Sequence, residues 1–196
     1  MKTMNLKKWT ILGIALIFSS AVIAGNYVID TSSSNVDWFG KKVTGEHNGS
    51  INIKEGSLEV AGGAIKGGTV VIDMQSIINE DIEDADYKAK LEGHLKSEDF
   101  FSVEKFPIAK LVLTDVEKSG DEYSFTGDLT IKGITKPVSF KGKSLADGDH
   151  VKVEGAITID RSDYDVKYGS SSFFDNLGDK MIYDDFTLNY VLVANK

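Results

Sequence analysis

Few side chains of this sequence have the types and spacing that catalysis or metal binding requires. The three histidines, His47, His94 and His150, are isolated, and none belongs to an HxH or HExxH pair that could bind zinc. The absence of cysteine excludes disulfides, thiolate metal sites and cysteine nucleophiles. The serine-rich segment 169–172 (GSSS) lacks the GxSxG pattern of a serine hydrolase. We therefore expect no catalytic residue, no metal site and no cofactor.

The acidic run 80–86 (EDIEDAD) lacks the glycine and the terminal glutamate of a calcium-binding loop. It precedes an amphipathic segment, so a solvated entrance to a helix explains it better, since acidic side chains favour helix N-termini.

Arg161 is the only arginine among 22 basic residues. It continues the inward-facing positions of a predicted strand, and three aspartates (Asp160, Asp163 and Asp165) lie close to it in sequence. One interpretation is a guanidinium fork that clamps a carboxylate or a loop carbonyl. The other is a contact with an anionic headgroup at a cavity mouth, because the guanidinium matches phosphate geometry.

Composition limits the class of protein that could present these residues. The 196 residues are 41% hydrophobic and 10% aromatic, which fits one globular domain rather than a disordered chain or a multi-spanning membrane protein. A formal charge of −8 argues against a nucleic-acid partner.

The N-terminus has the features of a signal peptide. Three lysines precede the apolar stretch 9–18, and Val22-Ile23-Ala24 fits a small-residue cleavage site. The alternative is an uncleaved anchor, but the stretch is short for the ~20 residues of a membrane span. We expect cleavage after Ala24 and a domain over residues 25–196. This domain would be periplasmic or secreted, with no stable membrane span and a net charge of −11 once the three lysines are lost.

Period-two alternation dominates the rest of the chain and predicts half-buried antiparallel strands joined by short glycine-containing turns. The clearest cases cover 123–132, 151–160 and 186–192. Weaker alternation covers 26–30, 36–43, 49–60, 65–74, 108–116 and 135–145. One segment differs: Tyr87, Leu91 and Leu95 recur every four residues and predict an amphipathic helix over 84–95. The segment 162–183 predicts a loop too long to be a simple connection.

This pattern predicts a mainly β, single-domain antiparallel barrel of eight or slightly more strands with one flanking helix, since closure protects strand edges. Glycine interrupts the inward face of four strands, at Gly40, Gly127, Gly142 and Gly155. These glycines could mark bends or bulges, or they could leave a lumen for a ligand; both can hold together.

Three blocks resemble the YceI-like family of exported polyisoprenoid-binding proteins. Residues 94–101 (HLKSEDFF) with Phe106-Pro107 resemble its HLxSxDFF…FP block, and 127–138 (GDLTIKGITKPV) resembles its GxLTxKGxTxPV hairpin. Residues 160–164 (DRSDY) are similar to its third block, and Tyr27-Val28-Ile29-Asp30 fits its start. Two positions depart from the pattern. Glu92-Gly93 stands where many members have an arginine and an acidic residue, and Asp165 stands where members have glycine.

The resemblance implies a lipocalin-like barrel with a tunnel for a long isoprenoid, such as a polyprenyl phosphate or a quinone tail. The candidate headgroup contacts are His94 and Arg161, although His94 could instead cap the helix or bond a loop carbonyl. Phe100, Phe101 and Phe106 would either plug one barrel end or line the tunnel. The candidate tunnel-lining residues are Trp38, Gly40, Phe101, Phe106, Phe125, Gly127, Leu129, Phe140, Gly142, Gly155, Ile157, Phe186, Leu188 and Tyr190.

The leading hypothesis is an exported binding protein without enzymatic activity that holds an isoprenoid or similar lipid for transport, storage or stress protection. The alternative is a structural or stress-response barrel with a filled interior and no ligand. The sequence leaves open the identity of the lipid and the oligomeric state, including a homodimer.

The signal-peptide prediction is directly testable. N-terminal sequencing of the exported protein should give Gly25 as its first residue. Recovery of the chain in the membrane fraction with segment 9–18 still attached would instead identify an anchor.

Overall fold

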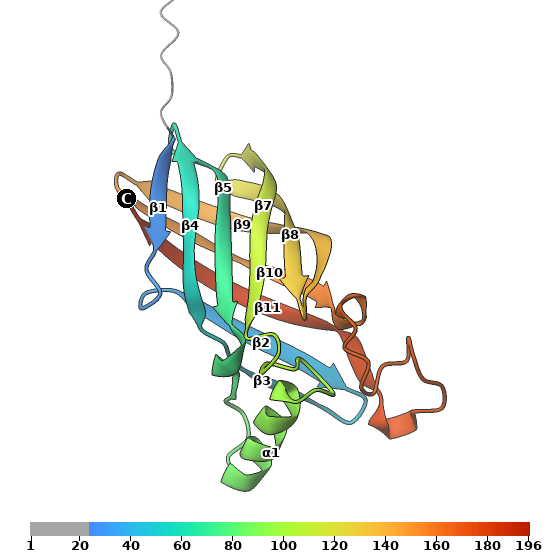
Figure 1. The fold of residues 1–196 in the computed structure, drawn as a ribbon. Coiled ribbons are helices and arrows are strands. Elements are labelled where there is room, and N and C mark those ends of the chain that lie inside the picture. The colour runs from blue at the N-terminus through green and yellow to red at the C-terminus, as the bar shows by residue number, and fades with distance from the viewer. Residues whose placement is uncertain (1–23) are drawn as a thin grey trace, which may run out of the picture.

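A computed structural model describes residues 24–196 (Figure 1), so the predicted signal peptide lies outside the described residues except for Ala24. The strands are β1 (Gly25–Ile29), β2 (Asn35–Lys42), β3 (Gly45–Ser50), β4 (Ile53–Ala61), β5 (Ala64–Asp73), β6 (Ile78–Asn79), β7 (Ile108–Ser119), β8 (Glu122–Ile131), β9 (Ile134–Asp147), β10 (His150–Asp160) and β11 (Ile182–Asn195). The helices are α1 (Ala85–Lys96) and the short 3-10 turns η1 (Met74–Ser76), η2 (Arg161–Tyr164) and η3 (Gly178–Lys180).

Eight strands form a closed antiparallel barrel, which confirms the predicted fold class. They follow the order β1-β4-β5-β7-β8-β9-β10-β11, and β11 pairs with β1 through Ile29↔Ala194 and Val28↔Asn195. Closure leaves these strands without a long free edge. β2, β3 and β6 continue the sheet from β11, and Figure 1 shows β2, β3 and α1 at one end of the barrel, with the C-terminus at the other.

A short break separates β3 from β4, and η1 with Ile77 separates β5 from β6. The sequence predicts one strand over 49–60, but the structure interrupts it at Ile51 and Asn52. At this break the Asn52 N–H donates to Ser76 Oγ at 2.7 Å, and Ser76 Oγ donates to the Asp73 carbonyl at 2.6 Å. Serine thus replaces the ladder hydrogen bonds that the break removes.

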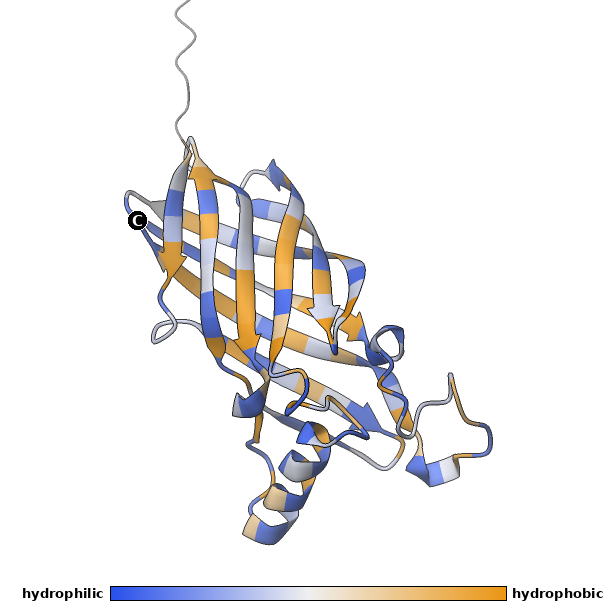
Figure 2. Ribbon diagram, viewed as in Figure 1, coloured by the Kyte–Doolittle hydropathy of each residue, from blue (hydrophilic) through white to orange (hydrophobic). Residues whose placement is uncertain are grey.

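The alternation predicted for the strands is present in β8 and β10. Tyr123, Phe125, Leu129 and Ile131 of β8 are buried, and β10 buries Val151, Val153, Ile157 and Ile159. Hydrophobic and hydrophilic residues accordingly alternate along the strands in Figure 2. The inward set forms one continuous core inside the barrel.

Aromatic rings fill the part of the barrel interior away from α1. Tyr123 stacks on Phe125 with ring centroids 5.6 Å apart, and Phe125 stacks on Phe140 at 5.2 Å. Phe140 then meets Tyr190 edge-on at 5.9 Å. Such ring pairs contribute stabilisation beyond the area that they bury.

The inward glycines of β8, β9 and β10 allow close packing rather than leaving vacant space, which corrects the lumen interpretation at these positions. A Cβ atom on Gly127 would lie 2.6 Å from the Val112 carbonyl oxygen. On Gly142 or Gly155 it would lie 2.6 Å from the Tyr190 hydroxyl. Gly40 differs, because a Cβ there meets nothing within 4 Å.

The predicted helix is confirmed as α1. The Asp84 side chain caps it by accepting from the backbone N–H groups of Asp86 and Tyr87. No residue of α1 is fully buried, so the helix lies against the barrel end rather than inside the core.

A glycine substitution tests the close packing. Gly127→Ala should reduce the free energy of unfolding by about 1–3 kcal/mol, because the methyl group overlaps the β7 backbone. Urea unfolding followed by circular dichroism measures this change.

Gly93 of α1 provides the matched control, since a Cβ there meets nothing within 4 Å. Gly93→Ala should increase stability by up to ~1 kcal/mol through helix propensity. Wild-type stability for Gly127→Ala would contradict the close-packing assignment.

Candidate functional site

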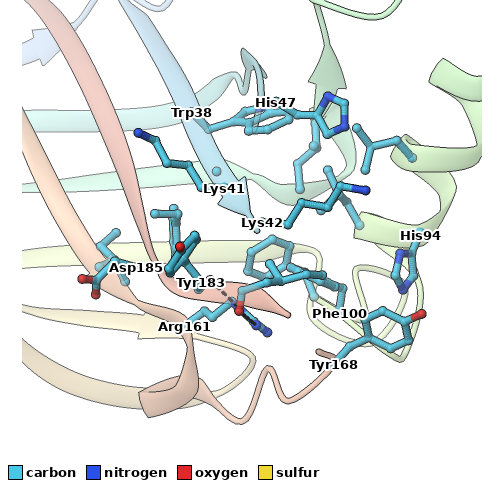
Figure 3. Close-up of a pocket in the computed structure, with 18 of the residues that line it drawn as sticks. Trp38, Lys41, Lys42, His47, His94, Phe100, Arg161, Tyr168, Tyr183 and Asp185 are labelled. Atoms are coloured by element: carbon cyan, nitrogen blue, oxygen red, sulfur yellow. Dashed lines mark hydrogen bonds between the residues drawn. The ribbon is translucent and has the colours of Figure 1, made fainter. Parts of the chain in front are cut away.

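A cavity of about 460 Å³ lies at the barrel end that faces α1. Its walls come from the β2–β3 hairpin, the inner ends of β8, β10 and β11, helix α1 and the 162–181 segment. Figure 3 shows labelled side chains from β2, β3, α1, the 162–181 segment and β11 around this space. The volume falls within the ~300–1,000 Å³ of small-molecule sites.

The inner part of the cavity is apolar. It is lined by Trp38, Leu129, Ile159, Phe186 and Leu188. The indole N–H of Trp38 donates to the Ile78 carbonyl at 2.9 Å, so this polar group is already satisfied by the protein. What remains toward the cavity is a hydrocarbon and aromatic surface, which suits an apolar ligand.

Charged residues gather at the outer part of the cavity. Lys41 and Lys42 come from β2, and Asp179, Lys180 and Asp185 come from η3 and β11. Lys41 lies 3.6 Å from Glu46 in an exposed ion pair, which contributes little to stability. The cavity therefore has a charged mouth and an apolar interior.

Helix α1 covers one side of the cavity with Leu91, His94 and Leu95. Buried Asn79 holds the helix in place, because its backbone N–H donates to the Glu92 carboxylate at 2.8 Å. The side-chain Oδ1 of Asn79 also accepts from the Ile82 N–H. A short polar network thus joins α1 to β6.

The same network continues to the cavity wall through Asp81. This carboxylate accepts from the Asn48 N–H at 2.9 Å and lies 2.8 Å from His47 Nδ1. Partial burial alone would raise the pKa of Asp81, but hydrogen bonds from Asn48, His47 and Asn79 outweigh it and lower the pKa. Asp81 therefore stabilises the fold above its unfolded pKa, and this contribution is lost as the pH falls through its lowered native pKa.

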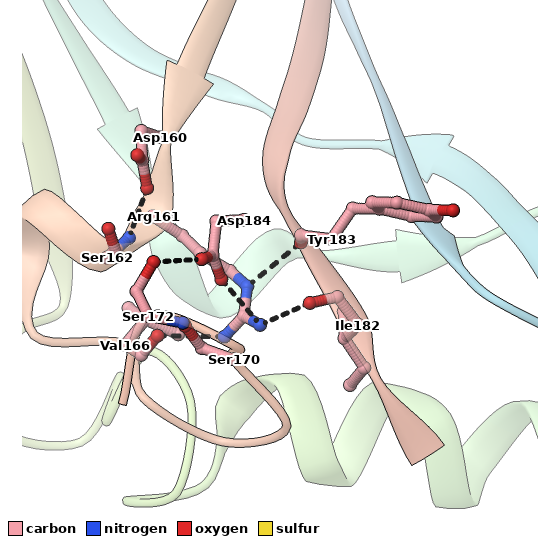
Figure 4. A network of polar contacts seen from close by, with 9 residues as sticks. All are labelled: Asp160, Arg161, Ser162, Val166, Ser170, Ser172, Ile182, Tyr183 and Asp184. Atoms are coloured by element: carbon pink, nitrogen blue, oxygen red, sulfur yellow. Dashed lines mark hydrogen bonds and ion pairs between the residues drawn. The ribbon is translucent and has the colours of Figure 1, made fainter. Parts of the chain in front are cut away.

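Arg161 is buried, with 2% of its surface exposed, and its donors point to protein groups (Figure 4). Nε donates to the Tyr183 carbonyl at 3.2 Å, Nη1 to Val166 at 2.8 Å and Nη2 to Ile182 at 3.0 Å. This arrangement matches the interpretation of a guanidinium that clamps chain carbonyls. Only the Val166 carbonyl lies in the loop, whereas those of Ile182 and Tyr183 belong to β11. Arg161 also lies on the cavity wall.

Asp184 supplies the counter-charge to Arg161. Its Oδ1 lies 3.1 Å from Nη2 as an ion pair, and its Oδ2 accepts from Ser172 Oγ at 2.7 Å. Burial lowers the pKa of Arg161, and the charges of Asp184 and Asp160 oppose that shift. The guanidinium also stacks 5.3 Å above the Phe100 ring.

The segment after η2 turns sharply at Asp165, which has φ 58°. This left-handed conformation explains why glycine suits the position in the family pattern, and aspartate tolerates it. The turn buries Tyr164 and Val166. Burial raises the pKa of the Tyr164 hydroxyl to about 12.

The structure brings together half of the predicted site residues. Those on the cavity wall are Trp38, Gly40, His94, Phe101, Leu129, Arg161, Phe186 and Leu188. The His94 ring lies edge-on to Tyr168, with centroids 4.4 Å apart, and to Phe100 at 5.5 Å. Within the described chain, no hydrogen bond engages its ring nitrogens, so the predicted headgroup contact of His94 stays a prediction.

The other predicted residues do not line the cavity: Phe106, Phe125, Gly127, Phe140, Gly142, Gly155, Ile157 and Tyr190. Most of them face inward but lie deeper in the barrel, within the aromatic and glycine packing described above. Phe106 lies elsewhere, 3.1 Å from the Cβ position of Gly133 in the β8–β9 turn. The alternation of residues along a strand identifies which side chains face the barrel interior. It does not identify how far along the barrel axis each of them lies.

Sequence reasoning missed several wall residues. The sequence placed Leu91 and Leu95 on the apolar side of the predicted helix. It did not predict that this side faces the barrel cavity. His47 comes from the β2–β3 hairpin and Tyr168 from the irregular 162–181 segment, where no periodicity identifies an inner face. Tyr183 fell within the loop predicted over 162–183, but the structure places it in β11.

Two further features of residues 24–196 concern metal ligands and membrane-spanning helices. No His, Cys, Asp or Glu side chains there form a group of three that could hold a metal ion. No helix in the described part of the chain has both the length and the apolar character to span a membrane.

Similar proteins of known structure share this fold. BcnA from Burkholderia cenocepacia matches with a TM-score of 0.69 and 22% identity over 85% of this chain and 99% of that chain. A polyisoprenoid-binding domain from Saccharophagus degradans matches with a TM-score of 0.61 and 15% identity over 86% of this chain and 97% of that domain.

Sequence relatives indicate the family. A UPF0312 protein from Shewanella denitrificans is 33% identical over 143 residues, 71% of this chain and 72% of its own length. Protein YceI from Escherichia coli O157:H7 is 46% identical over 61 residues, 31% of this chain and 32% of its own length. The YceI-like domain model matches residues 27–194, which span the barrel, α1 and the cavity walls. The three sequence blocks, the closed barrel and this match together show that the chain belongs to the YceI-like domain family.

Proposed function

We propose that this protein is an exported, non-enzymatic carrier that holds a long-chain isoprenoid or similar lipid in the cavity beside α1. The observation that carries the proposal is the division of the cavity into an apolar interior and a charged mouth. A lipid has the same division between its tail and its headgroup.

The interior favours a hydrocarbon tail for a simple physical reason. Each buried CH₂ group contributes ~0.8 kcal/mol, so a tail binds without polar contacts. The indole N–H of Trp38 and the guanidinium of Arg161 already donate hydrogen bonds to backbone carbonyls, so neither group needs a hydrogen-bond acceptor on the ligand. The name of the Saccharophagus degradans domain supports a polyisoprenoid as the ligand class.

The mouth suits the polar end of the lipid. Lys42 and Lys180 are cationic groups on the cavity wall, and within residues 24–196 neither has an ion pair within 4.0 Å. We propose that they, rather than the buried Arg161, whose Nε, Nη1 and Nη2 already donate to chain carbonyls, meet an anionic headgroup. Storage, transport or stress protection are the roles that such a carrier would serve in the periplasm.

Extraction of the native protein tests the proposal. We expect the protein purified from its own periplasm to release an isoprenoid or a related lipid into organic solvent, detected by mass spectrometry. A matched extract of the Trp38→Ala/Leu188→Ala double variant should contain less lipid, because two apolar side chains of the cavity wall are removed. Repeatedly empty wild-type protein would favour the alternative of a barrel without a ligand.

Arg161 provides the second test. Arg161→Gln should cost about 3–5 kcal/mol of stability, because Asp184 is left buried without its counter-charge. We expect the affinities for a polyprenyl phosphate and for a neutral quinone of equal tail length to fall by the same factor. Isothermal titration with each ligand measures this ratio.

The mouth lysines are the matched control for that experiment. Lys42→Gln/Lys180→Gln should weaken the phosphate more than the quinone, with little change in unfolding temperature. A selective loss of the phosphate in Arg161→Gln would instead assign the headgroup contact to Arg161.

A further inference from the structure

The cavity ends partway along the barrel. On β11 the last wall residue is Leu188, and the next inward residue, Tyr190, is not part of the wall. The same step occurs on β10 between Ile159 and Ile157, and on β8 between Leu129 and Gly127. On each of these three strands the inward residues therefore change from cavity wall to packed core, and Tyr190 marks this level on β11.

Tyr190 has a specific packing arrangement at this level. Gly142 pairs with Gly155 across β9 and β10, and Gly155 pairs with Tyr190 across β10 and β11. The Tyr190 hydroxyl lies 2.6 Å from the Cβ position of each glycine. The two glycines thus form a recess in the wall, and the tyrosine side chain reaches across it.

Other rings complete the packing around Tyr190. Phe140 meets it edge-on at 5.9 Å, and Phe125 stacks on Phe140. The Tyr190 hydroxyl donates to the Lys141 carbonyl over a long 3.4 Å, and burial raises its pKa. The phenol is therefore fixed mainly by ring and glycine packing.

The position of this level gives the cavity a finite depth. Ile182 and Leu188 mark the outer and inner wall on β11, six residues apart. At ~3.3 Å per residue this segment is about 20 Å long. A strand tilt of ~35–45° reduces it to about 15 Å along the barrel axis.

We propose that Tyr190, seated on Gly142 and Gly155, forms the floor of the cavity and sets the length of lipid tail that fits inside. This inference rests on the proposed function and refines its ligand class. The ligand has one polar end at the lysine-lined mouth and a tail whose far end stops at Tyr190. Any longer tail has to fold back or leave the cavity.

A chain-length series tests the floor. The probes are farnesol, geranylgeraniol and solanesol, which share one headgroup and differ in the number of isoprene units. Trp38 lines the cavity and is the only tryptophan in residues 24–196, so quenching of its fluorescence reports binding. For the wild type we expect affinity to rise from farnesol to geranylgeraniol and not to rise further for solanesol.

Two variants should move the floor in opposite directions. Tyr190→Ala removes the ring, so solanesol should gain at least about three-fold in affinity over geranylgeraniol because more of the tail is buried. Leu188→Phe adds bulk above the floor, so geranylgeraniol should lose affinity while farnesol keeps it. The second variant preserves the ring packing and remains informative if Tyr190→Ala fails to fold.

Tyr190→Phe is the matched control, since it keeps the ring and should retain the wild-type length pattern. Affinity that continues to rise through solanesol in the wild type would overturn the floor assignment, as would an unchanged pattern in folded Tyr190→Ala and Leu188→Phe. In both cases the proposed lipid binding would stand. Failure of the wild type to bind any of the three probes would defeat the proposed function together with the floor.

Discussion

The buried Arg161–Asp184 pair is the interaction on which the cavity end of the barrel depends. Arg161 is the first residue after β10, and its three carbonyl acceptors lie in the following segment and at the start of β11. One guanidinium therefore joins the strand, the irregular segment and the returning strand. A buried charge without partners is costly. The contacts of the guanidinium therefore fix the path of the chain around Arg161. Ile182 and Tyr183 reach the cavity wall through the same contacts.

The barrel has two unlike halves. Away from α1, aromatic rings contact one another and lie close to backbone glycines. Toward α1, the strands β2, β3 and β6 carry the wall past the core, and the helix covers the remaining side. The glycines explain the boundary, because Gly142 and Gly155 allow Tyr190 to lie across the wall where ordinary side chains would collide with it. The same alternation of inward-facing residues along the strands thus gives a cavity at one end of the barrel and a packed core at the other.

The sequence predicted the barrel and α1 well, because strand alternation and helix periodicity are local signals. Gly142 and Gly155 were correctly placed on the inner face, but their role depended on Tyr190, which lies 48 and 35 positions away in the sequence and is brought close by strand register. Arg161 was likewise singled out by composition, and only the fold showed that chain carbonyls occupy its donors. Depth along a barrel is a tertiary property, so alternation alone could not separate Leu188 from Tyr190.

The placement of polar groups also decides how a ligand could be recognised. Hydrogen bonds of Asn79, Asp81 and Glu92 connect α1, β6 and the β2–β3 hairpin to one another. The indole of Trp38 donates to the β6 backbone. Since few unpaired donors remain along the inner wall, shape and length dominate there, while charge acts only at the mouth. A site of this kind distinguishes tails by how far they reach and headgroups by their charge. Helix α1 takes part in this division through Leu91 and Leu95, which add apolar surface to the cavity wall, while Glu92 binds the backbone of Asn79.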